Sequence, residues 1–178
     1  ELLSETYAAF HRVLGTDHPL TLYVQNNVAQ TRLSRGHAQD AELEFREVLL
    51  LRRKNLPEGH TQIADTLTGL GECLIVNGNL SEAECVLQEA LRTYHANLSD
   101  NHVRIAQAEN VLGECLTAQG RCQEAEPFLI RSVARFSRGN DSTARQIRKG
   151  LQRLVDLYVA GEKPEAAAQW QAELDQRK

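Results

Sequence analysis

Histidines at a fixed spacing are the residues of this chain that most invite a metal-binding interpretation. His18, His60 and His102 lie 42 residues apart in similar loops. If the loops belong to successive units of stacked helices, equivalent residues lie farther apart than the roughly 8–10 Å between neighbouring helices. A metal ion holds its ligands at about 2 Å. We therefore expect these histidines to be loop or helix-cap residues, and we predict neither a metal nor a cofactor.

Four cysteines, Cys73, Cys85, Cys115 and Cys122, are the candidate nucleophiles or redox groups. No CxxC motif is present, and Cys73 and Cys115 share the 42-residue spacing of the histidines. A buried cysteine behaves as a small apolar residue, and free thiols are typical of reducing compartments. We predict four free thiols and a cytoplasmic location.

Other catalytic and ligand-binding signatures are missing from the sequence. It has no GxSxG, no glycine-rich phosphate loop, and no HRD or DFG motif. The 24 acidic and 20 basic residues are mixed along the chain and give a net charge of −4, which argues against a nucleic-acid partner. No apolar run is long enough to cross a bilayer. We predict a protein that is not an enzyme and that binds neither nucleic acid nor a membrane.

The 42-residue period also runs through residues that shape a fold. Three residue types recur in the same order, at Gly36, Gly78 and Gly120, at Ala41, Ala83 and Ala125, and at Glu42, Glu84 and Glu126. Gly161 and Ala166 repeat the pattern one residue early, which predicts a one-residue deletion in the last unit. A period of this length is typical of a solenoid, whose units bury a core by stacking. We predict one domain, 1–178, with a half repeat at 1–21 and repeats at 22–63, 64–105, 106–147 and 148–178.

Each unit contains two helical segments and no sustained alternation of a strand, so the predicted class is all-α. The first helix is clearest at 61–76, where Ile63, Leu67 and Leu74 share one face, and its counterparts are predicted at 20–35, 103–118 and 142–160. Counterparts of the second helix, which contains 83–94, are predicted at 38–54, 122–137 and 163–176, with a further helix at 2–14. The repeated glycines suit the turn between the two, where φ is positive. Asn79 and Glu82 resemble a capping box at the start of a second helix.

Small residues predict a close approach of the two helices in each hairpin. Gly71 and Gly113 stand on the first helix and Ala83 on the second. Small side chains let helices approach, and large neighbours such as Leu87 and Leu129 then fill the gaps.

This pattern resembles the tetratricopeptide repeat family. The second unit carries it at Leu67, Leu70, Gly71, Leu74, Gly78, Ala83, Leu87 and Ala90. The 42-residue length and the loop GTDHPLT at 15–21 look like the kinesin-light-chain type of repeat. The segment 153–170 is similar to the end of such arrays in bacterial serine/threonine protein kinases. The resemblance implies a right-handed superhelix of antiparallel helix hairpins.

In that family the first helix of each hairpin lines a concave surface that binds peptides. The resemblance places twelve residues of this chain there: Tyr23, Asn26, Gln30, Asp65, Thr68, Glu72, Gln107, Asn110, Glu114, Lys149, Gln152 and Asp156. Glu72, Glu114 and Asp156 would form an acidic row, and the amides of Asn26 and Asn110 could hold a peptide backbone. We expect such a row to favour a basic peptide, with binding that weakens as salt rises. The alternative is that the row is only a solvated helix face.

Two features depart from the family pattern. The twelve positions lack the paired lysines and arginines with which relatives clamp a C-terminal carboxylate, which argues against a chaperone-tail binder. Gln25 and Arg32 stand where core residues are usually apolar. We expect either a looser first unit or an arginine whose stem is shielded by its neighbour.

These observations predict a protein-interaction module that binds a peptide or a partner domain in a concave groove. The chain starts at Glu1, in the middle of the pattern, so we expect a non-catalytic piece of a larger protein such as a bacterial kinase. The alternative is a structural or self-assembly scaffold, because the half unit at 1–14 presents an unpaired apolar face and uncapped solenoid ends tend to associate.

Overall fold

The computed structural model describes residues 2–138 and 144–177, and all regular secondary structure in these ranges is α-helix. The helices are α1 (Leu2–Leu14), α2 (Pro19–Ser34), α3 (Ala38–Asn55), α4 (Thr61–Val76), α5 (Leu80–Asn97), α6 (Val103–Ala118), α7 (Cys122–Ser137), α8 (Ala144–Ala160) and α9 (Pro164–Asp175). The all-α prediction is confirmed. The first two residues of the helix predicted at 142–160 lie outside the described residues.

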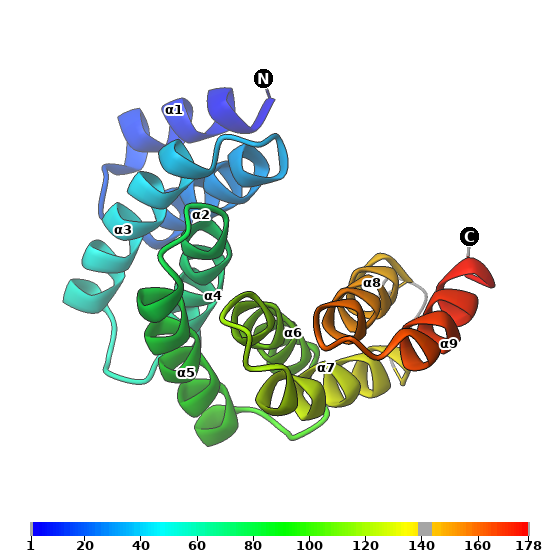
Figure 1. Ribbon diagram of the computed structural model, residues 1–178. Coiled ribbons are helices and arrows are strands. Elements are labelled where there is room, and N and C mark those ends of the chain that lie inside the picture. Colours follow the sequence, from blue (N-terminus) through cyan, green and yellow to red (C-terminus); the bar gives the residue numbers. More distant parts are fainter. Residues whose placement is uncertain (1, 139–143, 178) are drawn as a thin grey trace.

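The helices form one continuous stack of hairpins, because each helix contacts the next along the chain. The first helices of the hairpins are α2, α4, α6 and α8, and the second helices are α3, α5, α7 and α9. Figure 1 shows the stack as an arc with α1 at one end and α9 at the other. The first three hairpins begin at Pro19, Thr61 and Val103, three residues before the unit starts placed at 22, 64 and 106.

Glycines on the first helices bring the two helices of a hairpin together, as the small residues predict. A Cβ on Gly71 would lie 2.7 Å from Cγ of Leu87, and one on Gly113 would lie 2.5 Å from Cγ of Leu129. Both leucines are fully buried. The backbone of the first helix is therefore the surface against which the large residue of the second helix packs.

The turn between the helices of each hairpin holds one residue with positive φ. It is Gly36, Gly78 and Gly120 in the first three hairpins, at φ of 87°, 83° and 78°. In the last hairpin it is Glu162, at φ 54°, and not Gly161. Ala167, 42 residues after Ala125, is buried, whereas Ala166 is only half-buried. The predicted one-residue deletion is therefore wrong at this turn. The 42-residue spacing continues through it, but the position with positive φ holds Glu162 in place of a glycine.

The histidines of the period are helix caps, as predicted. His18, His60 and His102 precede α2, α4 and α6, and each Nδ1 accepts a hydrogen bond from a backbone N–H two residues on, at 3.2 Å. The capping box at Asn79 is absent. The Asn79 side chain makes no cap hydrogen bond, and the Glu82 carboxylate is instead held by Arg46 of α3 at 2.8 and 2.9 Å.

Candidate functional site

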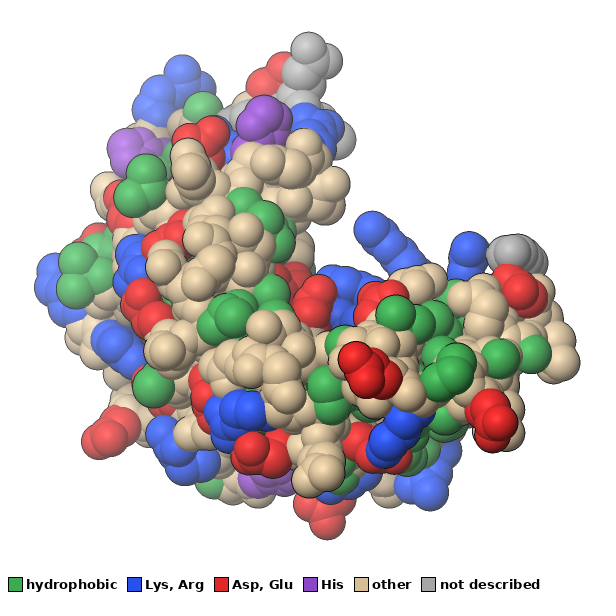
Figure 2. Space-filling model, in the orientation of Figure 1, with side chains coloured by type: hydrophobic (Ala, Val, Ile, Leu, Met, Phe, Trp, Pro, Cys, Tyr) green, Lys and Arg blue, Asp and Glu red, His purple; other side chains and the backbone are tan. Residues whose placement is uncertain are grey.

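The concave side of the arc holds a groove of about 710 Å³ that the first helices line (Figure 2). Three residues of the second helices also reach it, and these are repeat equivalents: Arg52, Tyr94 and Phe136. Nine of the twelve residues placed on the concave surface line the groove: Tyr23, Asn26, Gln30, Asp65, Thr68, Glu72, Gln107, Asn110 and Lys149. Glu114, Gln152 and Asp156 are not among its lining residues.

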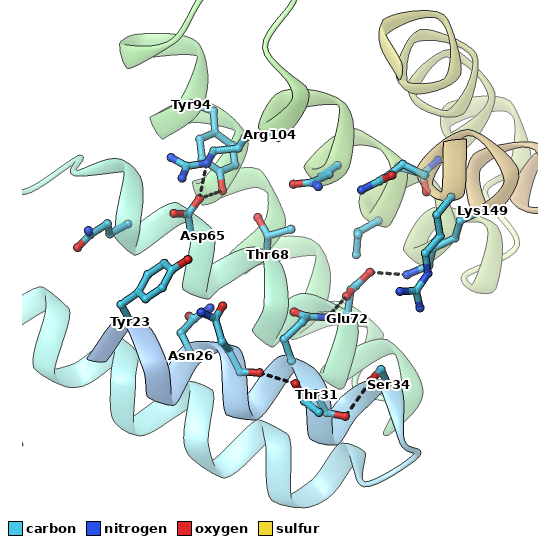
Figure 3. Close-up of a pocket in the computed structure, with 18 of the residues that line it drawn as sticks. Tyr23, Asn26, Thr31, Ser34, Asp65, Thr68, Glu72, Tyr94, Arg104 and Lys149 are labelled. Atoms are coloured by element: carbon cyan, nitrogen blue, oxygen red, sulfur yellow. Dashed lines mark hydrogen bonds and ion pairs between the residues drawn. The ribbon is translucent and has the colours of Figure 1, made fainter. Parts of the chain in front are cut away.

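A chain of polar contacts crosses the groove from α2 to α8. Gln30 donates from Nε2 to Glu72 at 3.0 Å, and Lys149 Nζ lies 2.6 Å from Glu72 Oε1 (Figure 3). Burial alone would raise the pKa of Glu72, but the charges of Lys149 and Arg153 and these hydrogen bonds lower it. Glu72 is therefore an ionised carboxylate that already has partners.

The predicted acidic row is not an open anionic surface. Glu72 faces Lys149, the carboxylate of Glu114 pairs with Arg153, and Asp156 accepts a hydrogen bond from Gln152 at 3.0 Å. The cations of α8 neutralise the first two members of the row. The preference for a basic peptide loses its physical basis, since the two carboxylates that would carry it are already paired.

The two asparagines of the groove differ in what they can offer a ligand. Asn110 is 2% exposed, donates to Ser132 Oγ at 2.9 Å and accepts from Arg153, so both ends of its amide are used inside the protein. Asn26 is half-buried, and its Oδ1 accepts from Thr66 at 3.2 Å. A role in holding a peptide backbone therefore stays open for Asn26 but not for Asn110.

Basic side chains outnumber acidic ones in the groove. Its lining includes two carboxylates, Asp65 and Glu72, and five cations: Arg52, Arg104, Arg145, Lys149 and Arg153. Figure 2 shows basic side chains in the hollow and projecting above it from the side of α8. Of these five cations, only Lys149 is among the residues predicted from the sequence to line the groove. The 42-residue period could have drawn attention to Arg52, because the residues at the same position of the next two units are aromatic.

A second polar cluster of the groove joins α4, α5 and α6. The Tyr94 hydroxyl donates to Asp65 Oδ1 at 2.8 Å, and Arg104 Nε lies 3.2 Å from the same oxygen. Burial and the negative charge of Asp65 raise the pKa of Tyr94, so its hydroxyl stays protonated and keeps donating. Tyr23 extends from α2 toward this cluster and is 57% exposed (Figure 3).

The first unit accommodates its unusual residues by polar contacts. Gln25 is 3% exposed and donates to Glu47 at 2.8 Å, while Arg32 pairs with Glu44 at 3.2 Å. One oxygen each of Gln25 and Glu44 is buried without a hydrogen-bond partner among the described residues. The polar groups of this unit are thus incompletely satisfied, and looser packing of the first unit stays a prediction.

The described cysteines are free thiols, as predicted. Burial raises the pKa of Cys73 to about 12 and that of Cys115 to about 11, so neither forms a nucleophilic thiolate at neutral pH. Within residues 2–138 and 144–177 no three His, Cys, Asp or Glu side chains are grouped so that they could hold a metal ion. None of the described helices has the length and apolarity needed to span a membrane.

Comparisons with known proteins agree with this architecture. Residues 62–138 match the family model for the tetratricopeptide repeat, and a search of curated proteins finds no match. A structure of nearly identical TPR-like repeats of a putative kinesin light chain from Podosopora anserina is 22% identical, with a TM-score of 0.70 over 99% of this chain and 83% of that chain.

Two further structures are similar. BtubC (BKLC) from P. vanneervenii is 17% identical, with a TM-score of 0.74 over 89% of this chain and 63% of that chain. A TPR-like protein from Chlorobium tepidum TLS is 22% identical, with a TM-score of 0.63 over 76% of this chain and 93% of that chain. Residues 62–138 therefore match the tetratricopeptide repeat model, and the helices on either side of them continue the helical-repeat fold of these similar structures.

Proposed function

We propose that this chain is a non-catalytic interaction module that binds a peptide segment of a partner protein in its concave groove. Repeats of this family act in protein–protein interaction or as scaffolds. The observation that carries the proposal is the groove itself, about 710 Å³ in volume and lined from four successive hairpins. Exposed Tyr23 offers a ring for an apolar side chain, and Asn26, Gln30 and Gln107 offer amides for a backbone.

The charges of the groove favour a peptide with acidic residues over the basic peptide that the sequence suggested. Five cations against two carboxylates line the groove, and Arg145 and Lys149 are exposed on α8. Complementary charge raises the association rate and fixes the register of a bound segment. Because exposed charges are screened, such binding weakens as ionic strength rises.

Fluorescence anisotropy with labelled, amidated ten-residue peptides tests this proposal. We expect an Asp/Gly peptide to bind at least about tenfold more tightly than a Lys/Gly peptide at low salt. The double variant Arg145→Glu with Lys149→Glu should weaken binding of the acidic peptide. Arg92→Glu is the matched control, since Arg92 is exposed on α5 and does not line the groove. A preference for the lysine peptide, or equal loss in both variants, would contradict the proposal.

A scaffold that associates through its ends is the second candidate, and exposed apolar residues at the α1 end favour it. Val13 is 73% exposed, Leu20 51% and Leu3 40%. Light scattering over a wide range of protein concentration separates the two functions, because a strict monomer excludes assembly through this face. The cytoplasmic location and the kinase parent remain predictions.

A further inference from the structure

Arg52 occupies a position that the repeat gives to an aromatic ring. Its counterparts 42 and 84 residues further on are Tyr94 and Phe136. All three side chains are 2% exposed, and they line the groove from α3, α5 and α7. A ring suits this position because it buries apolar area without burying a charge. The first hairpin thus holds a cation where the next two hold a ring.

The guanidinium of Arg52 is only partly satisfied within the chain. Nη1 donates to the carbonyl oxygen of Gln62 and to Thr66 Oγ1, both at 2.7 Å, and lies 3.4 Å from Asn26 Oδ1. Nε is buried and has no hydrogen-bond partner among the described residues. Burial lowers the pKa of Arg52, and the negative charge of nearby Asp65 only partly offsets this effect. The side chain is therefore a buried cation with donors to spare.

A second arginine in the same groove shows what Arg52 lacks. Arg153 is 6% exposed, pairs with Glu114 and lies 3.8 Å from Glu72. Among residues 2–138 and 144–177, the ion pairs with N···O of 4.0 Å or less do not include Arg52. A buried charge is costly unless an opposite charge accompanies it. Arg52 is thus a buried arginine of the groove without a direct ion pair among the described residues, and the nearest negative charge that acts on it is Asp65.

The groups around Arg52 leave a positive excess at this end of the groove. Arg104 lies close enough to repel Arg52, and Asp65 is the carboxylate between them. Asp65 is already engaged by Arg104 and Tyr94, as Figure 3 shows. One carboxylate therefore serves two guanidinium groups. Planar arginine forks bind carboxylate and phosphate oxygens well.

We propose that this end of the groove is an anion site, in which Arg52 binds a carboxylate or phosphate group of the ligand with Arg104 and Asn26 beside it. The natural source of the anion is the peptide segment of the proposed function, on which this part of the inference rests. The anion supplies the charge that burial of Arg52 requires, and it fixes the register of the peptide along the groove.

Two small probes, acetate and inorganic phosphate, test the anion site without a peptide. Each is titrated against chloride at constant ionic strength while NMR follows Arg52 Nε–H and the backbone amide of Gln62. We expect saturable shifts of both signals in the wild type. In Arg52→Tyr, which places the residue of the next unit in this position, the Gln62 shift should be lost or binding weakened at least about tenfold. Arg53→Gln is the matched control, because Arg53 pairs with Glu89 away from the groove.

Two peptides then identify the source of the carboxylate. One is an amidated Asp/Gly peptide and the other a Ser/Gly peptide with a free C-terminus, each measured with the wild type, Arg52→Tyr and Arg53→Gln. The peptide whose carboxylate occupies the site should bind Arg52→Tyr at least about fivefold more weakly than the wild type, and it should bind Arg53→Gln as the wild type does. If Arg52→Tyr does not fold, Arg104→Gln replaces it, with about threefold weaker binding of acetate expected.

The outcomes separate this inference from the proposed function. Equal ion shifts in the wild type and in Arg52→Tyr, or unchanged acetate binding in Arg104→Gln, overturn the anion site. A peptide that binds the groove with the same affinity in Arg52→Tyr overturns it as well, but leaves peptide binding intact. If no peptide binds, the proposed function fails, and the ion titrations still decide whether Arg52 holds an anion.

Discussion

Glu162 takes a backbone conformation that the other three hairpin turns give to glycine. Its φ is 54°, whereas Gly36, Gly78 and Gly120 have φ between 78° and 87°. A side chain in this left-handed region costs roughly 1–2 kcal/mol relative to glycine. The adjacent Gly161 does not relieve the cost, because it lies one residue too early. The turn into α9 is therefore under local strain.

We predict that Glu162→Gly raises the free energy of unfolding by about 0.5–1 kcal/mol. The released strain exceeds the entropy that glycine adds to the unfolded chain. Urea denaturation followed by circular dichroism measures the change. Glu165→Gly is the matched control, since Glu165 lies in the first turn of α9 and glycine there should destabilise by up to about 1 kcal/mol. Equal losses in both variants would show that the turn is not strained.

Within each hairpin, the contact between a helix backbone and a leucine is what holds the pair together. Gly113 of α6 illustrates it, because an added Cβ would lie 2.5 Å from both Cγ and Cδ2 of Leu129. Leu129 is fully buried, so a shift of its side chain has to displace close-packed core residues. Neither helix can move away without opening the core between hairpins.

We therefore predict that Gly113→Ala lowers the free energy of unfolding by about 1–3 kcal/mol, as overpacking of a dense core does. Denaturant titration checks the value. Leu129→Ala in the same chain should relieve part of the clash, so that the two effects are not additive. A loss in Gly113→Ala below about 0.5 kcal/mol would mean that the two helices can separate at little cost.

Helix positions could be predicted from the sequence far better than side-chain contacts. The ranges 61–76, 103–118 and 122–137 agree with α4, α6 and α7, because apolar spacing, turn glycines and histidine caps all repeat and so reinforce one another. The last turn was misplaced because Gly161 stands beside the position that needs positive φ. A periodic pattern locates a backbone conformation only where the favoured residue is retained.

At the scale of the whole molecule, the curvature of the stack decides which charges meet, and no local pattern encodes it. Lys149 and Glu72 are 77 residues apart and belong to helices separated by a full hairpin, yet their charged atoms lie 2.6 Å apart. The residues of the candidate groove could be named from the repeat, but their pairing could not. That is why an acidic row was expected where paired charges lie.

The contact between Lys149 and Glu72 should couple α8 to α4 and help to hold the groove at its present curvature. Lys149 is 55% exposed and Glu72 17%, so we predict a coupling of about 0.5–1 kcal/mol. A double-mutant cycle with Glu72→Gln and Lys149→Met measures it by urea denaturation. The cycle Lys54→Met with Asp17→Asn is the control, because this pair is more exposed and its charged atoms lie 3.3 Å apart. We expect a smaller coupling energy for it.

The pH dependence of this coupling has a defined sign. The pKa of Glu72 is lowered in the folded protein, so the stability that the contact contributes is fully present above the unfolded pKa of a glutamate. It is lost as pH falls through the lower folded pKa, when the carboxyl takes up a proton. The coupling energy should therefore begin to fall once the pH drops below the unfolded pKa of a glutamate and should vanish below the folded pKa of Glu72, and small-angle X-ray scattering should then show a more open arc. A coupling that grows as the pH falls, or an arc that is equally open in Lys149→Met and the wild type at neutral pH, would contradict this role.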